Sequence, residues 1–148
     1  MKVGLYGFGF PNRLYGGVIA DLALFKNDKL YSSSSINYHS ALYASPKYQF
    51  VVASGLSYAL AKNKFSLHPG IQIGYLNTTH LNQHSFNGGC GRLSIELTYA
   101  HGRFEYGFLI SQVFGYGWIK ENHLPFDRYV AYIPNTVGGI ELKYNFRR

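Results

Sequence analysis

Bulky and small residues alternate along most of this chain. Around residue 55 the even positions are mostly large and apolar (Phe50, Val52, Ser54, Leu56, Tyr58, Leu60), and the odd positions are smaller (Val51, Ala53, Gly55, Ser57, Ala59). The alternation returns around Ile71, Ile95 and Leu142. A period of two residues puts the bulky side chains on one face of a β-strand and the small or polar ones on the other. The pattern therefore predicts an all-β protein.

The alternating segments predict about eight strands. With 148 residues the chain fits one domain, residues 1–148, since domains usually hold about 100 to 200 residues. The predicted strands are Lys2 to Phe10, Tyr15 to Phe25, Leu30 to Leu42, Tyr48 to Ala61, Phe65 to Leu76, Gly91 to Ala100, Arg103 to Tyr116 and Val137 to Phe146.

The connections between these strands alternate in length. Tight turns are predicted at residues 26–29, 62–64 and 101–102, where Asn, Asp and Gly supply turn chemistry. Between them lie a short break at 11–13, a loop at 43–47, and two long loops, Asn77 to Cys90 and Gly117 to Thr136. Outer-membrane barrels have short periplasmic turns, longer extracellular loops and an even number of strands. This order predicts that both termini lie on the periplasmic side.

The bulky face must be covered by a second sheet or by lipid. A soluble sandwich would cover it with a second sheet, whereas membrane barrels place aromatic girdles at the two ends of this face. Closure is required in lipid, because an open sheet edge leaves unpaired backbone groups. We therefore expect a closed antiparallel up-and-down transmembrane β-barrel in a bacterial outer membrane, with a soluble lipocalin-like barrel as the alternative. The expected girdle residues are Tyr6, Phe10, Tyr38, Tyr75, Tyr99, Phe104, Tyr132, Tyr144 and Phe146.

Composition and charge narrow the class further. Charged residues make up 14% of the chain, against about 25% in soluble domains, and no apolar stretch approaches the roughly 18 residues of a membrane helix. Lys2 is followed at once by Gly and aromatic residues, so we expect a mature exported form with a start Met added. The net charge of +7 is dispersed over turns, loops and ends, which suits lipid phosphates and argues against nucleic acid. The single cysteine, Cys90, excludes an internal disulfide.

The interior of an eight-strand barrel is narrow enough to be filled by side chains or by one slim ligand. The periplasmic half is predicted to hold a salt-bridged polar plug of His68, Glu96, Thr98, Arg103, Glu105, Glu141, Lys143 and Asn145. The other half is small or apolar, with Gly7, Gly9, Gly17, Ile19 and Gly115 among its expected members. It either holds an acyl chain or contains glycines only to relieve crowding. The ligand-binding residues expected there are Val51, Ala53, Gly55, Gly74, Leu76, Leu109, Val113, Val137 and Gly139.

Candidate catalytic residues stand at the far end of the third predicted strand. His39 and Ser40 supply an imidazole and a hydroxyl, the minimum for acyl transfer. Neighbours on a strand point to opposite faces, so the two can cooperate only if the strand ends or bulges there. His80, His84 and His123 are further candidates in the long loops. His80, His84 and Cys90 have a spacing that suits zinc but lack an evident fourth ligand, so we expect no metal and no cofactor.

Several segments resemble the lipid A palmitoyltransferase (PagP) family. Residues 129–136, Tyr-Val-Ala-Tyr-Ile-Pro-Asn-Thr, precede Gly138-Gly139 and a last strand ending in Phe146, and they are similar to the Tyr-Ile-Pro-Gly-Thr segment of the family. Residues 13–17, Arg-Leu-Tyr-Gly-Gly, are similar to the entrance of its glycine-rich second strand. The resemblance implies a barrel whose interior holds a palmitoyl chain.

The departures from this family concern activity. The sequence has no counterpart of the family's amphipathic N-terminal helix, and Gly4 and Tyr6 stand where its first strand has a catalytic His. His39 replaces the Asp of an Asp-Ser pair. The resemblance therefore implies the fold with altered or absent acyltransferase activity.

Three hypotheses follow from the sequence. In the first, a monomeric outer-membrane barrel binds a lipid or acyl chain, with lipopolysaccharide or phospholipid as partner, and transfers it if it is an enzyme. In the second, a non-enzymatic barrel uses its long loops to bind a partner or to shield the surface. In the third, a soluble barrel carries a small apolar ligand.

Overall fold

The computed structural model is all-β and forms a closed antiparallel barrel of eight strands. It describes residues 1–10, 13–24, 29–41, 48–79, 85–120, 128–132 and 137–146. The predicted fold class is thereby confirmed, and such a barrel is typical of outer-membrane proteins. In the described part of the chain, no helix is long and apolar enough to cross a membrane.

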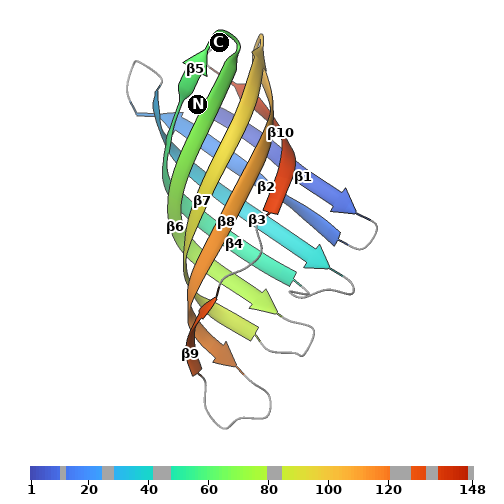
Figure 1. Ribbon diagram of the computed structural model, residues 1–148, viewed down its shortest axis with the longest axis vertical. Coiled ribbons are helices and arrows are strands. Elements are labelled where there is room, and N and C mark those ends of the chain that lie inside the picture. The colour runs from blue at the N-terminus through green and yellow to red at the C-terminus, as the bar shows by residue number, and fades with distance from the viewer. Residues whose placement is uncertain are drawn as a thin grey trace.

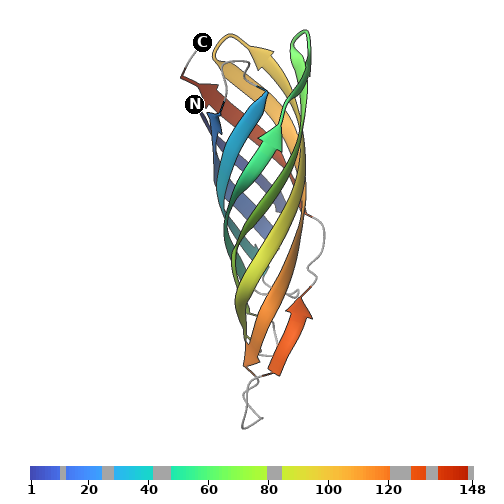
Figure 2. The same ribbon diagram turned by 90° about the vertical axis from the view of Figure 1, so that its left-hand side faces the viewer.

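Ten strand segments build the barrel (Figures 1 and 2). A break at Ala59 divides one wall strand into β4 and β5, both paired with β6, and β9 is a short strand beside the far end of β8. The segments are β1 (Lys2–Phe10), β2 (Arg13–Ala23), β3 (Leu30–Ala41), β4 (Tyr48–Tyr58), β5 (Leu60–Lys62), β6 (Phe65–Thr79), β7 (Ser85–His101), β8 (Phe104–Lys120), β9 (Arg128–Tyr132) and β10 (Val137–Asn145).

The barrel closes where its first and last strands meet. The pairing of β1 with β10 runs from Lys2 opposite Asn145 to Gly7 opposite Ile140, and β10 pairs with β8 on its other side. β1 begins and β10 ends at the same end of the barrel as the tight turn between β5 and β6, on the opposite side of the wall (Figures 1 and 2). We call this the short-turn end and the opposite one the loop end. The closure satisfies the backbone groups that an open sheet edge would expose.

Polarity across the barrel wall is the reverse of that in a soluble protein. The outer face consists of exposed apolar side chains such as Ile71 (59% exposed) and Ile73 (75%), whereas ionised side chains such as Lys143 (1%) lie inside. The predicted outward face of Leu56, Ile73, Ile95 and Leu142 is confirmed, since all four side chains are exposed.

Four residues were assigned to the wrong face. Tyr6, expected in the outer girdle, is 4% exposed and points into the barrel, because it pairs with the inward positions Glu141 and Gly17. Gly7 consequently belongs to the outer face, and Gly9, two residues further on, is exposed at the loop end. Arg103, expected in the plug, is exposed in the turn before β8.

The strands near the loop end are longer than the sequence predicted. β6, β7 and β8 contain 15, 17 and 17 residues, so paired strands extend through much of the two segments expected to be long loops. There the outer face carries polar residues, including Tyr75, whose hydroxyl donates to the amide oxygen of Asn87 over 3.1 Å. Polar residues stand on both faces of these strand extensions. The alternation of apolar and polar residues from which the strands were predicted is therefore absent there.

Two glycines allow neighbouring strands to approach closely. A Cβ at Gly74 would overlap the carbonyl oxygen of Val52, and one at Gly55 would overlap that of Ile71. We expect Gly74→Ala to destabilise the barrel by about 1–3 kcal/mol, because the strand must move to make room. Gly89→Ala is the control, since a Cβ there meets no heavy atom within 4 Å. Equal urea unfolding midpoints for the two variants would contradict this interpretation of the close approach.

Candidate functional site

A buried ion network fills the lumen near the short-turn end. The Lys143 ammonium lies 2.7 Å from an Asp21 carboxylate oxygen and 3.2 Å from one of Glu141, and it also contacts Glu96. A second pair, 2.9 Å apart, joins Lys2 and Glu105. Burying a charge is costly unless it is paired. The predicted salt-bridged plug is therefore present, without Arg103.

Arg92 lies across the lumen on the loop-end side of this network. It is 1% exposed, and its Nη1 donates to the Ser35 hydroxyl at 2.6 Å and to the Gln72 amide oxygen at 3.1 Å. Its guanidinium carbon lies 5.8 Å from the ring centroid of Tyr6 on the opposite wall. Lys2, Arg92 and Lys143, together with the buried polar side chains around them, occupy the described part of the lumen.

The half of the lumen towards the loop end, which is the lower half in Figure 1, is called the upper lumen here because it faces away from the short-turn end. The predicted ligand-binding residues line it. Val51, Ala53, Leu76 and Val113 form one buried cluster with Cys90, and Leu109 belongs to a second with Tyr6, Tyr15 and Ile19. Gly55, Gly74 and Gly139 also occupy inward positions, whereas the side chain of Val137 lies outside the described residues. The cavity between Tyr15, Asn37, His39, Gln49, Val51 and Val113 measures about 10 Å³, room for about one water. An acyl chain would fit in this lumen only if side chains moved.

The structure does not bring the side chains of His39 and Ser40 together. β3 keeps a regular register with both neighbours through this point, where Ser40 lies opposite Leu14 and Tyr48. His39 faces the lumen, and its ring centroid lies 6.4 Å from that of Tyr15. Ser40 points to the outer face, so the bulge or strand end that would bring the two side chains together is absent from β3.

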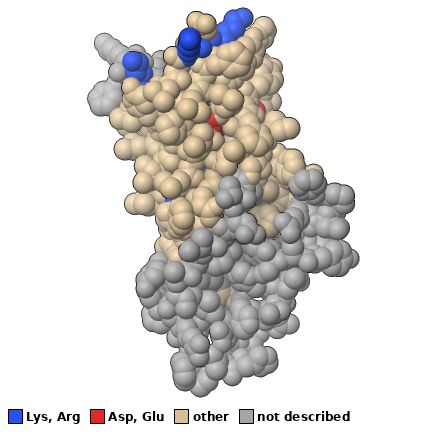
Figure 3. Space-filling view, viewed as in Figure 1, with Lys and Arg blue, Asp and Glu red and all other residues tan. Residues whose placement is uncertain are grey.

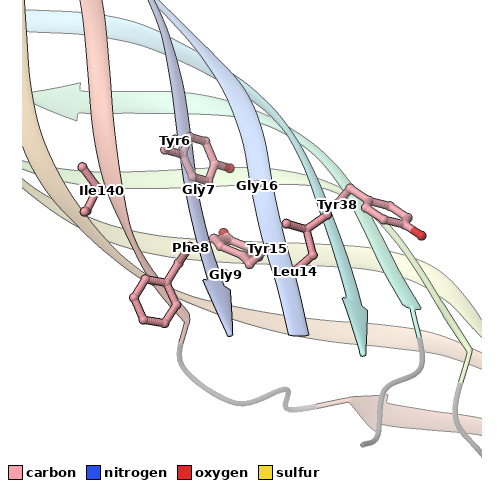
Figure 4. A pocket seen from close by; sticks show the side chains of 9 residues that line it. All are labelled: Tyr6, Gly7, Phe8, Gly9, Leu14, Tyr15, Gly16, Tyr38 and Ile140. Atoms are coloured by element: carbon pink, nitrogen blue, oxygen red, sulfur yellow. The ribbon is translucent and has the colours of Figure 1, made fainter. Parts of the chain in front are cut away.

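A groove of about 720 Å³ lies in the wall at the loop end, where β1 and β2 meet (Figure 4). Its volume falls within the range of about 300–1,000 Å³ that is usual for ligand sites. Gly7, Gly9 and Gly16 provide a lining without side chains. Phe8, Leu14 and Ile140 add apolar surface, and Tyr38 adds an exposed aromatic ring. Tyr6 and Tyr15 also border the groove, although both are buried.

The groove lies beside the point at which the pairing of β1 with β10 ends. β1 continues to Phe10, but its pairing with β10 ends at Gly7, opposite Ile140 of the groove. The Tyr6 and Tyr15 rings, 5.6 Å apart, belong to a buried cluster in the upper lumen. The groove and this cluster therefore involve the same stretch of the wall.

Sequence reasoning missed most of this groove. Tyr6 and Tyr38 were predicted for the outer girdle and Gly7 and Gly9 for the lumen, and none of the groove residues was predicted to bind a ligand. The available signal was the cluster of glycines in residues 4–17, which leaves a gap in an otherwise bulky outer face. His80, His84 and His123 lie outside the described residues. Within the described residues, no three His, Cys, Asp or Glu side chains are placed to hold a metal ion.

Comparison of the chain with protein-family models, curated proteins and solved structures finds no match. The candidate function consequently depends on the geometry of this barrel alone.

Proposed function

We propose that this protein is an integral barrel of a bacterial outer membrane that binds a lipid acyl chain at its loop end. The reversed polarity of the wall supports the membrane location: apolar side chains such as Ile71 cover the outside, and paired ions such as Lys143 fill the inside. Water would be a poor solvent for such an outer face, whereas hydrocarbon suits it. The filled lumen argues against a diffusion channel.

The groove beside Gly7 and Gly16 supports the lipid-binding part of the proposal. In a bilayer it would open directly onto acyl chains, and its glycines and aromatic rings offer a smooth apolar surface to one of them. If side chains in the upper lumen move apart, the residues around Val51 and Val113 would line the path of a chain that extends inward past Tyr6 and Tyr15.

Filling the groove tests this proposal. We expect Gly9→Phe to lower the amount of co-purified lipid on the order of tenfold, the effect of about 1.4 kcal/mol of binding free energy. A Cβ at Gly9 meets no heavy atom within 4 Å, so the variant should fold. The measurement is mass spectrometry of lipid extracted from the purified barrel.

Gly89→Phe is the matched control, because Gly89 is equally open but belongs to β7, outside the groove. Equal lipid content in both variants would contradict the groove as the binding site. The same spectrometer tests acyl transfer: incubation with phospholipid and lipid A yields a mass gain on the acceptor only if the barrel is an enzyme. Without this gain, the protein is a binding or structural barrel.

A further inference from the structure

Three exposed cations lie at the short-turn end. Lys62 and Lys64 flank the turn between β5 and β6, and Arg103 lies in the turn before β8. We call these three residues the cationic rim. Figure 3 shows Lys and Arg atoms grouped at this end of the barrel, above a surface made mostly of uncharged residues.

No exposed carboxylate offsets the cationic rim among the described residues. Asp21, Glu96, Glu105 and Glu141 are each at most 4% exposed and lie inside the barrel, where they form ion pairs with Lys143 and Lys2. The segregation is therefore complete in the described part of the chain: acidic groups are inside, and the cations of the rim face outward. Such a surface attracts anions.

The geometry of the turns holds the cationic rim close to the barrel. Asn63 and Gly102 adopt positive φ angles of 57° and 60°, as tight turns require, so their neighbours Lys62, Lys64 and Arg103 stay close to the strand ends. The Arg103 guanidinium also donates a hydrogen bond to the Tyr144 hydroxyl at 3.0 Å.

Aromatic side chains lie next to the cationic rim, on the outer face of the barrel. The ring centroids of Phe104 and Tyr144 are 5.4 Å apart, those of Tyr144 and Phe146 are 4.9 Å apart, and Phe65 packs on Tyr99 at 5.1 Å. Aromatic residues concentrate at the level of lipid head groups, and basic residues next to them meet the phosphates. Nucleic acid fits less well, because the cations stand in separate turns next to an apolar wall and do not form a stripe.

We propose that the cationic rim binds the phosphates of anionic phospholipids in the leaflet around the short-turn end, and so fixes the depth of the barrel. The inference rests on the membrane location proposed above. It concerns the end of the barrel opposite to the acyl-chain groove and involves none of the groove residues.

Native mass spectrometry in neutral detergent micelles tests this inference by titrating the barrel with phosphatidylglycerol or phosphatidylcholine. We expect preferential binding of phosphatidylglycerol. The triple variant Lys62→Gln, Lys64→Gln, Arg103→Gln should lower that affinity roughly 100-fold at low salt, since each cation near an anionic surface contributes about fivefold. The charge-preserving control Lys62→Arg, Lys64→Arg, Arg103→Lys should retain it.

Three outcomes would overturn the inference: equal binding of the two lipids by the unaltered protein, unchanged phosphatidylglycerol binding in the Gln variant, or equally strong binding of inorganic phosphate or single-stranded RNA without lipid. The membrane location is tested separately by insertion into vesicles of phosphatidylcholine alone, detected as heat-modifiable migration on gels. Failure to insert contradicts the proposed function. Insertion without a preference for phosphatidylglycerol contradicts only the role of the cationic rim.

Discussion

Replacing Lys143 by Met is expected to lower the free energy of unfolding by about 3–5 kcal/mol, the usual effect of removing one partner from a buried ion network. Its ammonium is the cation within ion-pair distance of Asp21, Glu96 and Glu141, and it is 1% exposed. Without it, three carboxylates remain crowded in a narrow lumen. Urea unfolding in detergent, followed by the fluorescence of the single tryptophan, measures the effect.

Two further variants show whether the loss comes from charge. Lys62→Met removes an exposed lysine from the turn before β6 and should change stability by less than about 0.5 kcal/mol. Adding Glu96→Gln to Lys143→Met removes one unpaired carboxylate, so it should recover part of the loss. An unfolding midpoint of Lys143→Met equal to that of the unaltered protein would show that the network contributes nothing to stability.

Ile71→Arg is expected to weaken insertion into a bilayer by about 2–4 kcal/mol, as for a cation near the midplane on the lipid face of a membrane barrel. Ile71 lies near the middle of the outward row that runs from Phe65 to Tyr75, and it is 59% exposed. In a soluble barrel the same change at an exposed position would alter stability by less than about 0.5 kcal/mol. This variant therefore separates the membrane barrel from the lipocalin-like alternative.

The measurement is the fraction of barrel folded into phosphatidylcholine vesicles across a urea series. His101→Arg is the control, because it introduces the same cation at an exposed position in the short-turn end, outside the apolar face. A folded fraction of Ile71→Arg equal to that of the control would place the outer face in water.

The fold was predictable from the sequence wherever one face is bulky and the other small. Around Leu56 and Ile95 a single period of two fixes which side chains point outward, and the structure agrees. In β1 the signal fails, because glycines stand on both faces, as with Gly4 inside and Gly7 outside. There the face is decided by pairing, in which Tyr6 lies opposite Glu141.

The candidate site was less predictable because it combines residues that are distant in sequence. Ile140 reaches the groove only because β10 closes on β1, and Tyr38 comes from β3, on the other side of β2. No local sequence pattern predicts that residues so distant in the chain line one groove. For His39 and Ser40 the alternation rule was sufficient, since the regular strand separates their side chains.

The pairing of β1 with β10 also constrains the order of folding. Most neighbouring strands of the barrel are close in sequence and can form as hairpins, whereas Lys2 and Asn145 come from opposite ends of the chain. Joining such distant segments carries the largest loop-closure entropy and is slow. The pairing of β1 with β10 should therefore be the last part of the barrel to form. Until then the unpaired edges of β1 and β10 stay available to a chaperone or to a neighbouring chain.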